Sequence, residues 1–485
     1  MKRKFMKRVL GHILFLSFVL PNMFAQTPDT LWTRLYGGDE SEEGYAVLET
    51  SDNGLFIVAS TWSFGMGGAD AWLIRTDSNG DTLWTKSFGG TENDYLLDIT
   101  ETQQGNFILT GGTRSFGNGS YDAWFIKINN AGDLLWSKTY GTSEYEFCAS
   151  ITETPDGNFV AGGEGNPGGA SSDGFWFLKL NSTGDTLWTT TYETNEYSLF
   201  HEVESTIDGG TISIGTTDSN INILVKHNVT GNQEWVQNFS GLGRLSSVKQ
   251  IDNTGYVLTG YYTTPNFDSN IRIITTDAVG QIIMNKQYGS SNLNENASKI
   301  CVINDDGYIV VGEIGGNNLP ASGELFFFRF DSNGDSLWFT SYGSGFDEGD
   351  NIANDIIQTT NNDFMLTGRH AKDFNNQAWV IRLNAELTGI SGNKAETVKD
   401  FTLFQNYPNP FNPQTTINYQ LPKASNVELS IFNTLGQCVY NFKNEQQQAG
   451  SYTIAFNGAN LPSGVYIYRL KADNFWETKK MILLK

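Results

Sequence analysis

The sequence predicts an all-β protein, a seven-bladed β-propeller followed by a small immunoglobulin-like β-sandwich, and three observations lead to this prediction. A motif centred on a tryptophan recurs about every fifty residues along most of the chain. Between these motifs, apolar and polar residues alternate with the period of two that is typical of strands, and no stretch keeps a helical period. After residue 388 the composition changes to a proline-rich segment followed by further strand-like runs.

The repeated motif is clearest as GDTLWTKSFGG, residues 80–90, and it returns as GDLLWSKTYG, GDTLWTTTYE and GDSLWFTSYG. Its central residue lies at positions 32, 84, 136, 188, 235, 284 and 338, where the sixth copy has methionine instead of tryptophan. Each unit holds four short strands, and a polar residue followed by glycine, as in Gln104-Gly105, marks the hairpin turn between the first two. Seven four-stranded units of this length are typical of a β-propeller.

The two chain ends of the repeat region predict how the ring closes. The first unit contains only a tryptophan strand, around Trp32, and the last unit ends after its third strand at Asn384. We therefore predict that the first strand completes the last blade, which leaves no open sheet edge. Ten of the twelve tryptophans lie in third or fourth strands, where large rings fill the space between neighbouring sheets. The three cysteines, at positions 148, 301 and 438, are expected to be buried apolar residues rather than a disulfide framework.

The charge distribution excludes some classes of partner. The net charge is −22 for 485 residues, and residues 26–399 alone carry −29. This acidity argues against nucleic acid and anionic membrane surfaces, which require clusters of Lys and Arg. Residues 1–25 have the basic head and short apolar run of a secretory signal peptide, and no later segment is long and apolar enough to span a membrane. The predicted organisation is a signal peptide (1–25), a propeller (26–388), a polar linker (389–399) and a sandwich (400–485).

The C-terminal residues carry a specific resemblance. The runs are QNYPNPFNPQTTINYQLP from Gln405, NTLGQCVY from Asn433, LPSGVYIYRL from Leu461 and the terminal KKMILLK. Together they resemble the type A C-terminal sorting domain of the type IX secretion system of Bacteroidota. The resemblance implies Sec export to the periplasm and passage through the outer membrane, with residues 400–485 recognised by the secretion machinery. It also implies release or surface display, often after cleavage by a sortase-like protease. Residues 29–388 resemble uncharacterised propeller repeats of secreted bacterial proteins, which implies a fold and no chemistry.

Catalytic motifs are scarce in this sequence. HEVES at His201 begins like a zinc motif but has Ser205 in place of the second histidine. There is no nucleophile elbow, phosphate-binding glycine loop or Cys/His metal spacing, so we expect a protein that is not an enzyme and that needs no cofactor. The segment DSNGD, at Asp77 and Asp331, could ligate calcium, although other units carry fewer acids there and favour a plain turn.

One face of the propeller is the candidate binding site. The loops after the fourth strands and the loops between the second and third strands should emerge together on this face. The first set is acidic, with Asp39, Glu40, Glu42, Glu43, Glu92, Asp94, Glu144, Glu146, Glu193, Glu196, Glu295, Asp347, Glu348 and Asp350. The second set carries the aromatic residues Trp62, Phe64, Phe116, Tyr121, Phe267 and Phe374.

This combination of residues leaves several functions open. Exposed rings beside carboxylates could stack on sugars, and the acids could bind calcium or a basic partner. The face could also simply be a solvated surface that keeps a secreted protein soluble. We predict a non-catalytic module that binds an unknown extracellular ligand, a glycan or a protein. The alternative is a polysaccharide hydrolase or lyase, which would need two carboxylates that converge in one pocket and a raised pKa.

Overall fold

Strands are the regular elements of the part of the chain that the computed structural model describes, and none of the described residues forms a membrane-spanning helix. The described ranges are residues 30–165, 174–194, 196–264, 268–289, 293–304, 307–316, 323–342, 351–372, 375–384, 401–403, 414–421, 423–447, 450–459, 461–473 and 475–483. The predicted signal peptide and linker lie outside these ranges. Two compact units, residues 1–389 and 390–485, make up the chain.

The first compact unit, residues 1–389, contains seven four-stranded antiparallel sheets, which confirms the predicted propeller. Blades 1 to 4 are β2 (Glu42–Glu49), β3 (Leu55–Thr61), β4 (Asp70–Thr76), β5 (Thr82–Phe88); β6 (Asp94–Glu101), β7 (Phe107–Thr113), β8 (Asp122–Ile128), β9 (Leu134–Tyr140); β10 (Phe147–Glu153), β11 (Phe159–Glu164), β12 (Gly174–Leu180), β13 (Thr186–Glu193); and β14 (Ser198–Ser205), β15 (Thr211–Thr217), β16 (Asn222–His227), β17 (Gln233–Phe239). Blades 5 and 6 are β18 (Arg244–Asp252), β19 (Gly255–Thr263), β20 (Ser269–Asp277), β21 (Ile282–Tyr288); and β22 (Leu293–Ile303), β23 (Gly307–Gly316), β24 (Glu324–Asp331), β25 (Ser336–Tyr342).

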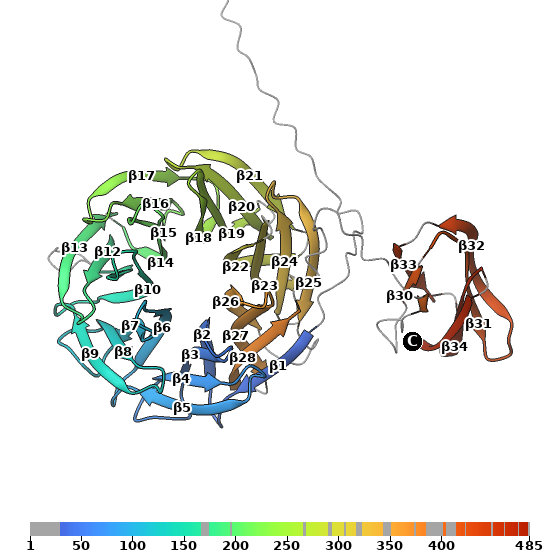
Figure 1. Cartoon of the computed structure of the whole chain (residues 1–485), viewed down its shortest axis with the longest axis horizontal. Coiled ribbons are helices and arrows are strands. Elements are labelled where there is room, and N and C mark those ends of the chain that lie inside the picture. Colours follow the sequence, from blue (N-terminus) through green and yellow to red (C-terminus); the bar gives the residue numbers. More distant parts are fainter. Residues whose placement is uncertain are drawn as a thin grey trace, which may run out of the picture. The chain divides into compact units, whose positions relative to one another are not determined.

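Blade 7 joins the two ends of the repeat region. It consists of β26 (Ile352–Gln358), β27 (Phe364–Lys372), β28 (Asn375–Leu383) and β1 (Thr30–Tyr36), and β1 pairs antiparallel with β28. The first strand therefore completes the last blade, as predicted. In Figure 1 the first strands β2, β6, β10, β14, β18, β22 and β26 surround the centre of the ring, and the fourth strands form its outer edge.

All seven first strands carry a β-bulge at the same place. The extra residues are Tyr45, Leu97, Ala149, His201, Ser246, Ser298 and Asn354. A bulge disrupts the ladder locally and leaves a backbone group without its strand partner. In several blades a side chain of the preceding blade fills this role: Asp98 Oδ2 accepts from the Ile151 amide at 2.8 Å, and Glu202 Oε2 accepts from the Val248 amide at 2.7 Å. The channel wall is therefore hydrogen-bonded from blade to blade.

The repeated tryptophan motif explains how neighbouring blades are joined at the outer edge. Trp32 of β1 lies against the turn of blade 1, where a Cβ atom at Gly80 would come within 2.8 Å of its Cη2 atom. Arg34 pairs with Asp81 at 3.2 Å, and the Tyr36 hydroxyl donates to the Gly80 carbonyl at 2.7 Å. We call this set of contacts the rim clasp. Its contact with the turn glycine recurs with Trp84 on Gly132, Trp136 on Gly184, Trp188 on Gly231, Trp235 on Gly280 and Met284 on Gly334.

Third-strand tryptophans are buried in the blades, whereas most fourth-strand tryptophans are half-buried beneath the turn of the next blade. The core lies between successive sheets, in clusters that combine residues of adjacent blades. Cys148 is buried and Cys301 is half-buried, but Cys438 is exposed, so the expectation of burial is wrong for Cys438. Its strand alternates, and Cys438 falls on the solvent side of that strand.

The second unit has two sheets that share one core. One sheet contains β29 (Thr402–Leu403), β30 (Gln414–Leu421) and β33 (Gly450–Asn457). The other contains β32 (Cys438–Gln447), β31 (Ser425–Asn433), β34 (Gly464–Ala472) and β35 (Phe475–Leu483). Ile417 and Tyr419 of the first sheet pack with Leu429 and Tyr468 of the second. The unit is a small β-sandwich.

Candidate functional site

The two sets of loops that the sequence analysis placed on one face lie side by side, and we call this surface the loop face. The Glu40 amide donates to Ser63 Oγ at 2.9 Å, and the Glu92 amide donates to Ser115 Oγ at 3.0 Å. Each of these hydrogen bonds joins a loop after a fourth strand to a loop between second and third strands. At blades 1 and 2 the two sets of loops therefore form one surface beside the mouth of the channel.

Four of the acids expected on this face, Glu42, Asp94, Glu146 and Glu295, are buried, and the first three support its loops instead. Glu42, Asp94 and Glu146 are at most 1% exposed. Asp94 is typical, since Oδ2 accepts from the Gly90 amide at 2.7 Å and from Ser115 Oγ at 2.6 Å. A carboxylate that accepts several hydrogen bonds of this kind holds the backbone and is not available to a ligand.

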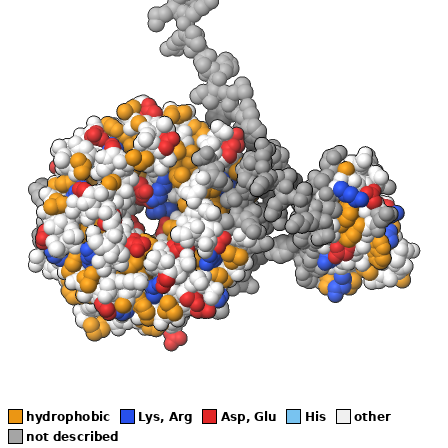
Figure 2. Space-filling view, viewed as in Figure 1, with side chains coloured by type: hydrophobic (Ala, Val, Ile, Leu, Met, Phe, Trp, Pro, Cys, Tyr) orange, Lys and Arg blue, Asp and Glu red, His pale blue; other side chains and the backbone are white. Residues whose placement is uncertain are grey.

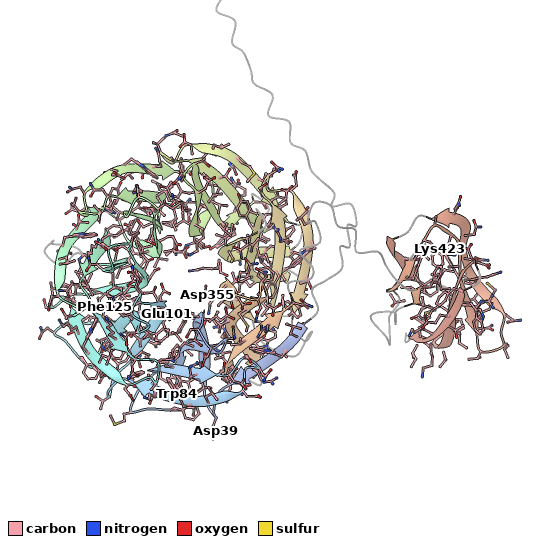
Figure 3. The ribbon with its side chains drawn as sticks, in the orientation of Figure 1. Asp39, Trp84, Glu101, Phe125, Asp355 and Lys423 are labelled. Atoms are coloured by element: carbon pink, nitrogen blue, oxygen red, sulfur yellow. The ribbon has the colours of Figure 1, made fainter. Side chains whose placement is uncertain are left out.

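The remaining acids lie on separate loops. Asp39, Glu40, Glu92 and Glu144 are exposed, and Glu43 is half-buried with Oε2 3.6 Å from Arg369. Figure 3 shows Asp39 at the periphery of the ring and Asp355 near its centre. Asp347, Glu348, Asp350, Phe267 and Phe374 lie outside the described residues. The described acids of the face are thus spread around the ring and do not meet in one pocket.

The predicted aromatic residues divide into exposed and packed groups. Trp62, Phe64 and Phe116 are 51%, 43% and 44% exposed. Phe64 also rests on Trp72, with ring centroids 5.1 Å apart, so its edge rather than its whole surface faces solvent. Tyr121 is half-buried and contacts Phe147. Trp62 is therefore the ring most available for stacking.

The channel wall holds a charged cluster that the sequence analysis missed. Glu202, on β14, forms ion pairs with Lys249 at 3.2 Å and Lys299 at 2.8 Å. Burial opposes the charge of Glu202, but the two lysines lower its pKa to about 2. Burial raises the pKa of Asp98 to about 6 and also raises the pKa of Asp355. Figure 2 shows basic and acidic side chains together around the central opening.

The two channel aspartates with raised pKa values are fully engaged by the protein. Asp98 Oδ1 accepts from the Ile99 amide and Oδ2 from the Ile151 amide, both at 2.8 Å. Asp355 Oδ1 and Oδ2 accept from the Ile356 and Val47 amides at 2.9 and 3.0 Å. All four oxygens are bound to backbone donors around the bulges. These carboxylates connect the blades and are poorly placed to transfer protons to a substrate.

A cavity of about 360 Å³ lies at the loop-face mouth of the channel, between blades 4, 5, 6 and 7. Its polar lining comes from His201, Arg244, Ser246, Tyr261, Asn296 and Glu313. Its volume lies within the range of about 300–1,000 Å³ that is common for small-molecule sites. Burial, with a contribution from Arg244, lowers the pKa of His201 to about 3, so this histidine is neutral.

Sequence reasoning had little chance of finding this cavity. His201 was considered only as part of an incomplete zinc motif, and Arg244 lies in a repeat whose motif is degenerate. The one available signal is positional: both residues fall at the bulge region of a first strand, which faces the channel in every blade. Recognising that signal requires knowing where the bulge lies.

The turns considered for calcium are held by their own hydrogen bonds. Asp77 Oδ1 accepts from the Asn79 and Asp81 amides at 2.8 and 2.9 Å, and Asp331 makes the same contacts at 2.9 and 2.7 Å. Such side-chain-to-backbone bonds are typical of ordinary Asx turns. Among the described residues, no three His, Cys, Asp or Glu side chains converge as a metal site.

Comparison with known families assigns the C-terminal unit. Residues 405–484 match the secretion system C-terminal sorting domain. The chain therefore carries a type IX sorting domain, as the sequence motifs implied, and this domain directs it across the outer membrane to the cell surface or the medium. No curated protein sequence matches the chain.

Solved structures share the propeller architecture at low identity. PorZ, a surface component of the type IX secretion system of Porphyromonas gingivalis, is 12% identical over 93% of this chain and 60% of its own, with a TM-score of 0.45. The Neurospora crassa Pan2 WD40 domain is 10% identical over 77% of this chain and 98% of its own, with a TM-score of 0.48. The polysaccharide lyase Uly1 is 11% identical over 72% and 92%, with a TM-score of 0.45. These likenesses concern the fold alone.

Proposed function

We propose that this chain, which ends in a sorting domain for export across the outer membrane, is a non-catalytic module that binds an extracellular ligand with its loop face. The observation that carries the proposal is the distribution of carboxylates. The exposed ones are distributed over several loops, whereas the channel aspartates with raised pKa values are bound by backbone amides. A binding surface tolerates this arrangement, but glycoside hydrolysis requires two carboxyl groups that flank one bond.

The exposed aromatic residues support a glycan as the ligand class. Trp62 and Phe116 lie in equivalent loops of blades 1 and 2; Trp62 is 51% exposed, and Phe116 is 44% exposed beside its contact with Trp124, whose ring centroid is 5.8 Å away. Aromatic rings with exposed faces offer apolar contact to sugar rings, while the neighbouring Glu92 and Asp39 carboxylates can accept hydrogen bonds from hydroxyl groups. A folded protein partner remains the other ligand class that such a surface suits.

A glycan array with the mature chain, with and without calcium, tests this proposal. We expect the mature chain to bind at least one glycan on the array and to release no cleavage products from it. Trp62→Ala should weaken that binding at least about tenfold, since it removes a large exposed contact surface. Leu83→Ala is the matched control, because Leu83 is 58% exposed on a fourth strand at the outer edge. Equal binding by both variants would contradict the use of the loop face.

A polysaccharide hydrolase or lyase is the second candidate, and one observation favours it. Burial raises the pKa of Glu164 to about 7, although its Oε1 accepts from the Phe200 amide at 3.2 Å. Phe200 lines the cavity at the channel mouth, so a carboxyl group able to exchange protons near neutral pH lies beside it. Incubation of the mature chain with acidic polysaccharides decides between the candidates. If the polysaccharides are shortened and Glu164→Gln abolishes this cleavage, the protein is an enzyme and the binding proposal is wrong.

A further inference from the structure

The cavity at the channel mouth contains polar atoms that the protein itself leaves unsatisfied. Arg244 makes no ion pair and no side-chain hydrogen bond with any described residue, and its Nε atom is buried. Asn296 donates from Nδ2 to Glu313 Oε1 at 2.8 Å, but its buried Oδ1 has no partner. Buried polar groups are nearly always paired, so one cationic donor and one acceptor in the same cavity require an explanation.

The hydrogen bonds around His201 define a second acceptor. Asn222 Nδ2 donates to the Gly243 carbonyl at 2.7 Å, and Asn222 Oδ1 accepts from the Leu245 amide at the same distance. The Thr216 hydroxyl has two oxygen acceptors, this Oδ1 at 3.1 Å and the Leu245 carbonyl at 3.4 Å. When it donates to either of them, Thr216 Oγ1 accepts from His201 Nε2, 3.2 Å away.

This arrangement favours the tautomer of the neutral histidine that carries its proton on Nε2 and leaves Nδ1 as an acceptor. The cavity therefore combines one cationic donor, Arg244, with three acceptors: His201 Nδ1, Asn296 Oδ1 and the Glu313 carboxylate. A guanidinium recognises an oxyanion, and neutral or anionic acceptors recognise hydroxyl groups.

We propose that this cavity binds a sugar acid, with Arg244 pairing the ligand carboxylate and with His201 and Asn296 accepting hydrogen bonds from ligand hydroxyls. The inference rests on the proposed binding function and names its ligand class. Pairing of Arg244 with a carboxylate would satisfy a cation that has no ion pair or side-chain hydrogen bond among the described residues, where the longer-range charge of Glu164 acts on it, and Asn296 Oδ1 would gain its missing donor. The volume of about 360 Å³ accommodates a ligand of this size.

Titration of the mature chain with sodium glucuronate, glucose and sodium sulfate, followed by ligand-observed NMR, tests the proposal. We expect glucuronate to bind at least tenfold more tightly than either glucose or sulfate. Glucose lacks the carboxylate, and sulfate lacks the hydroxyl groups. Equal binding of glucose would overturn the role of Arg244, and equal binding of sulfate would reduce the cavity to a general oxyanion site and overturn recognition of a sugar acid.

Two variants and a control locate the binding. Arg244→Gln should weaken glucuronate binding at least tenfold. Asn296→Asp has nearly the same shape but loses the Nδ2 donor to Glu313 and adds a carboxylate that competes with the ligand carboxylate for Arg244, so it should do the same even if Arg244→Gln fails to fold. Arg34→Gln removes an arginine of the rim clasp and should leave binding unchanged. Unchanged binding by Arg244→Gln and Asn296→Asp would overturn the inference. In that case, glycan retention that depends on Trp62 would still support the proposed function, whereas no retention of any glycan would contradict that function separately.

Discussion

The outer rim and the central channel are built from the same seven repeats but use them differently. At the rim, one position of the repeat holds tryptophan in six copies and methionine, Met284, in the other one. In the described turns this residue makes the same contact with a glycine. In the channel, the bulge has the same backbone geometry in all seven blades, yet its extra residue is Tyr45, Leu97, Ala149, His201, Ser246, Ser298 or Asn354. The repeat preserves packing at the rim and only the backbone in the channel.

This difference has a physical origin. A rim tryptophan must fit beneath the turn of the next blade, where even a methyl group on the glycine would overlap its ring. A bulge residue has no fixed side-chain partner: Ser246 and Asn354, for example, donate to backbone carbonyls of the next blade, which are present whatever side chains that blade carries. Departures from the repeat can therefore accumulate in the channel at little cost to the fold. Blades 4 to 6 contain such departures, and their His201, Ser246 and Ser298 line the cavity.

The largest effect is expected when a methyl group is placed in the rim clasp. Gly132 has φ 74°, and its Cβ atom would lie 2.2 Å from Trp84 Cη2. Gly132→Ala should destabilise the protein by about 3 kcal/mol, since left-handed strain of about 1 kcal/mol adds to displacement of the ring. Chemical denaturation of the mature chain measures this loss.

A second glycine separates these two contributions. Gly105 has φ 71°, but no atom lies within 4 Å of a Cβ atom placed there. Gly105→Ala should therefore cost only about 1 kcal/mol. Introducing Gly132→Ala into a Trp84→Ala background should lower its cost to that same value, because the overlapping ring is gone. If Gly132→Ala and Gly105→Ala lower the unfolding free energy equally, the contact between Gly132 and Trp84 does not stabilise the rim.

An effect of intermediate size is expected from pH in the channel. Burial raises the pKa of Asp98 to about 6 in the folded chain, against about 3.9 in an unfolded chain. The folded state then binds a proton more readily, so this group destabilises the protein above pH 6 and the penalty is relieved as the pH falls toward 4. Relative to Asp98→Asn, the wild type should gain about 1.4 kcal/mol between pH 7.5 and 5.

The control for this pH experiment is Ser150→Ala. This variant loses the hydroxyl that donates to Asp98 Oδ2 at 2.9 Å but keeps the carboxyl group. Its unfolding free energy should retain a pH dependence similar to that of the wild type. Parallel curves for the wild type and Asp98→Asn over this pH range would show that Asp98 is ionised in both the folded and unfolded states, contrary to its burial.

Prediction from the sequence succeeded where side chains recur and failed where they differ. The spacing of Trp84 and its counterparts was enough to predict seven blades, four strands in each and closure by β1. Alternation and composition could not distinguish an exposed Glu92 from a buried Asp94, because the two acids lie two positions apart where the chain enters β6. Two neighbouring sequence features do mark the buried acid. Asp94 follows Gly90, whose amide donates to its carboxylate, and it precedes a Thr-x-Ser segment whose Thr113 and Ser115 hydroxyls donate to the same carboxylate. The cavity is lined by residues of four blades, which come together only when the ring is closed, so the sequence of any one repeat does not reveal it.

The smallest effect is expected from the charged part of the rim clasp. Lys86 Nζ lies 3.2 Å from Asp133 Oδ1 and 3.0 Å from the Ala131 carbonyl, and both charged side chains are well exposed. Water and salt screen such pairs, so Lys86→Met should change the Tm by less than about 2 °C in physiological salt. Its apolar stem can still cover Trp84, whose ring lies beneath the ammonium group at 5.1 Å. A loss of more than about 5 °C, reduced by added salt, would mean that ion pairs rather than the tryptophan–glycine contact hold neighbouring blades together.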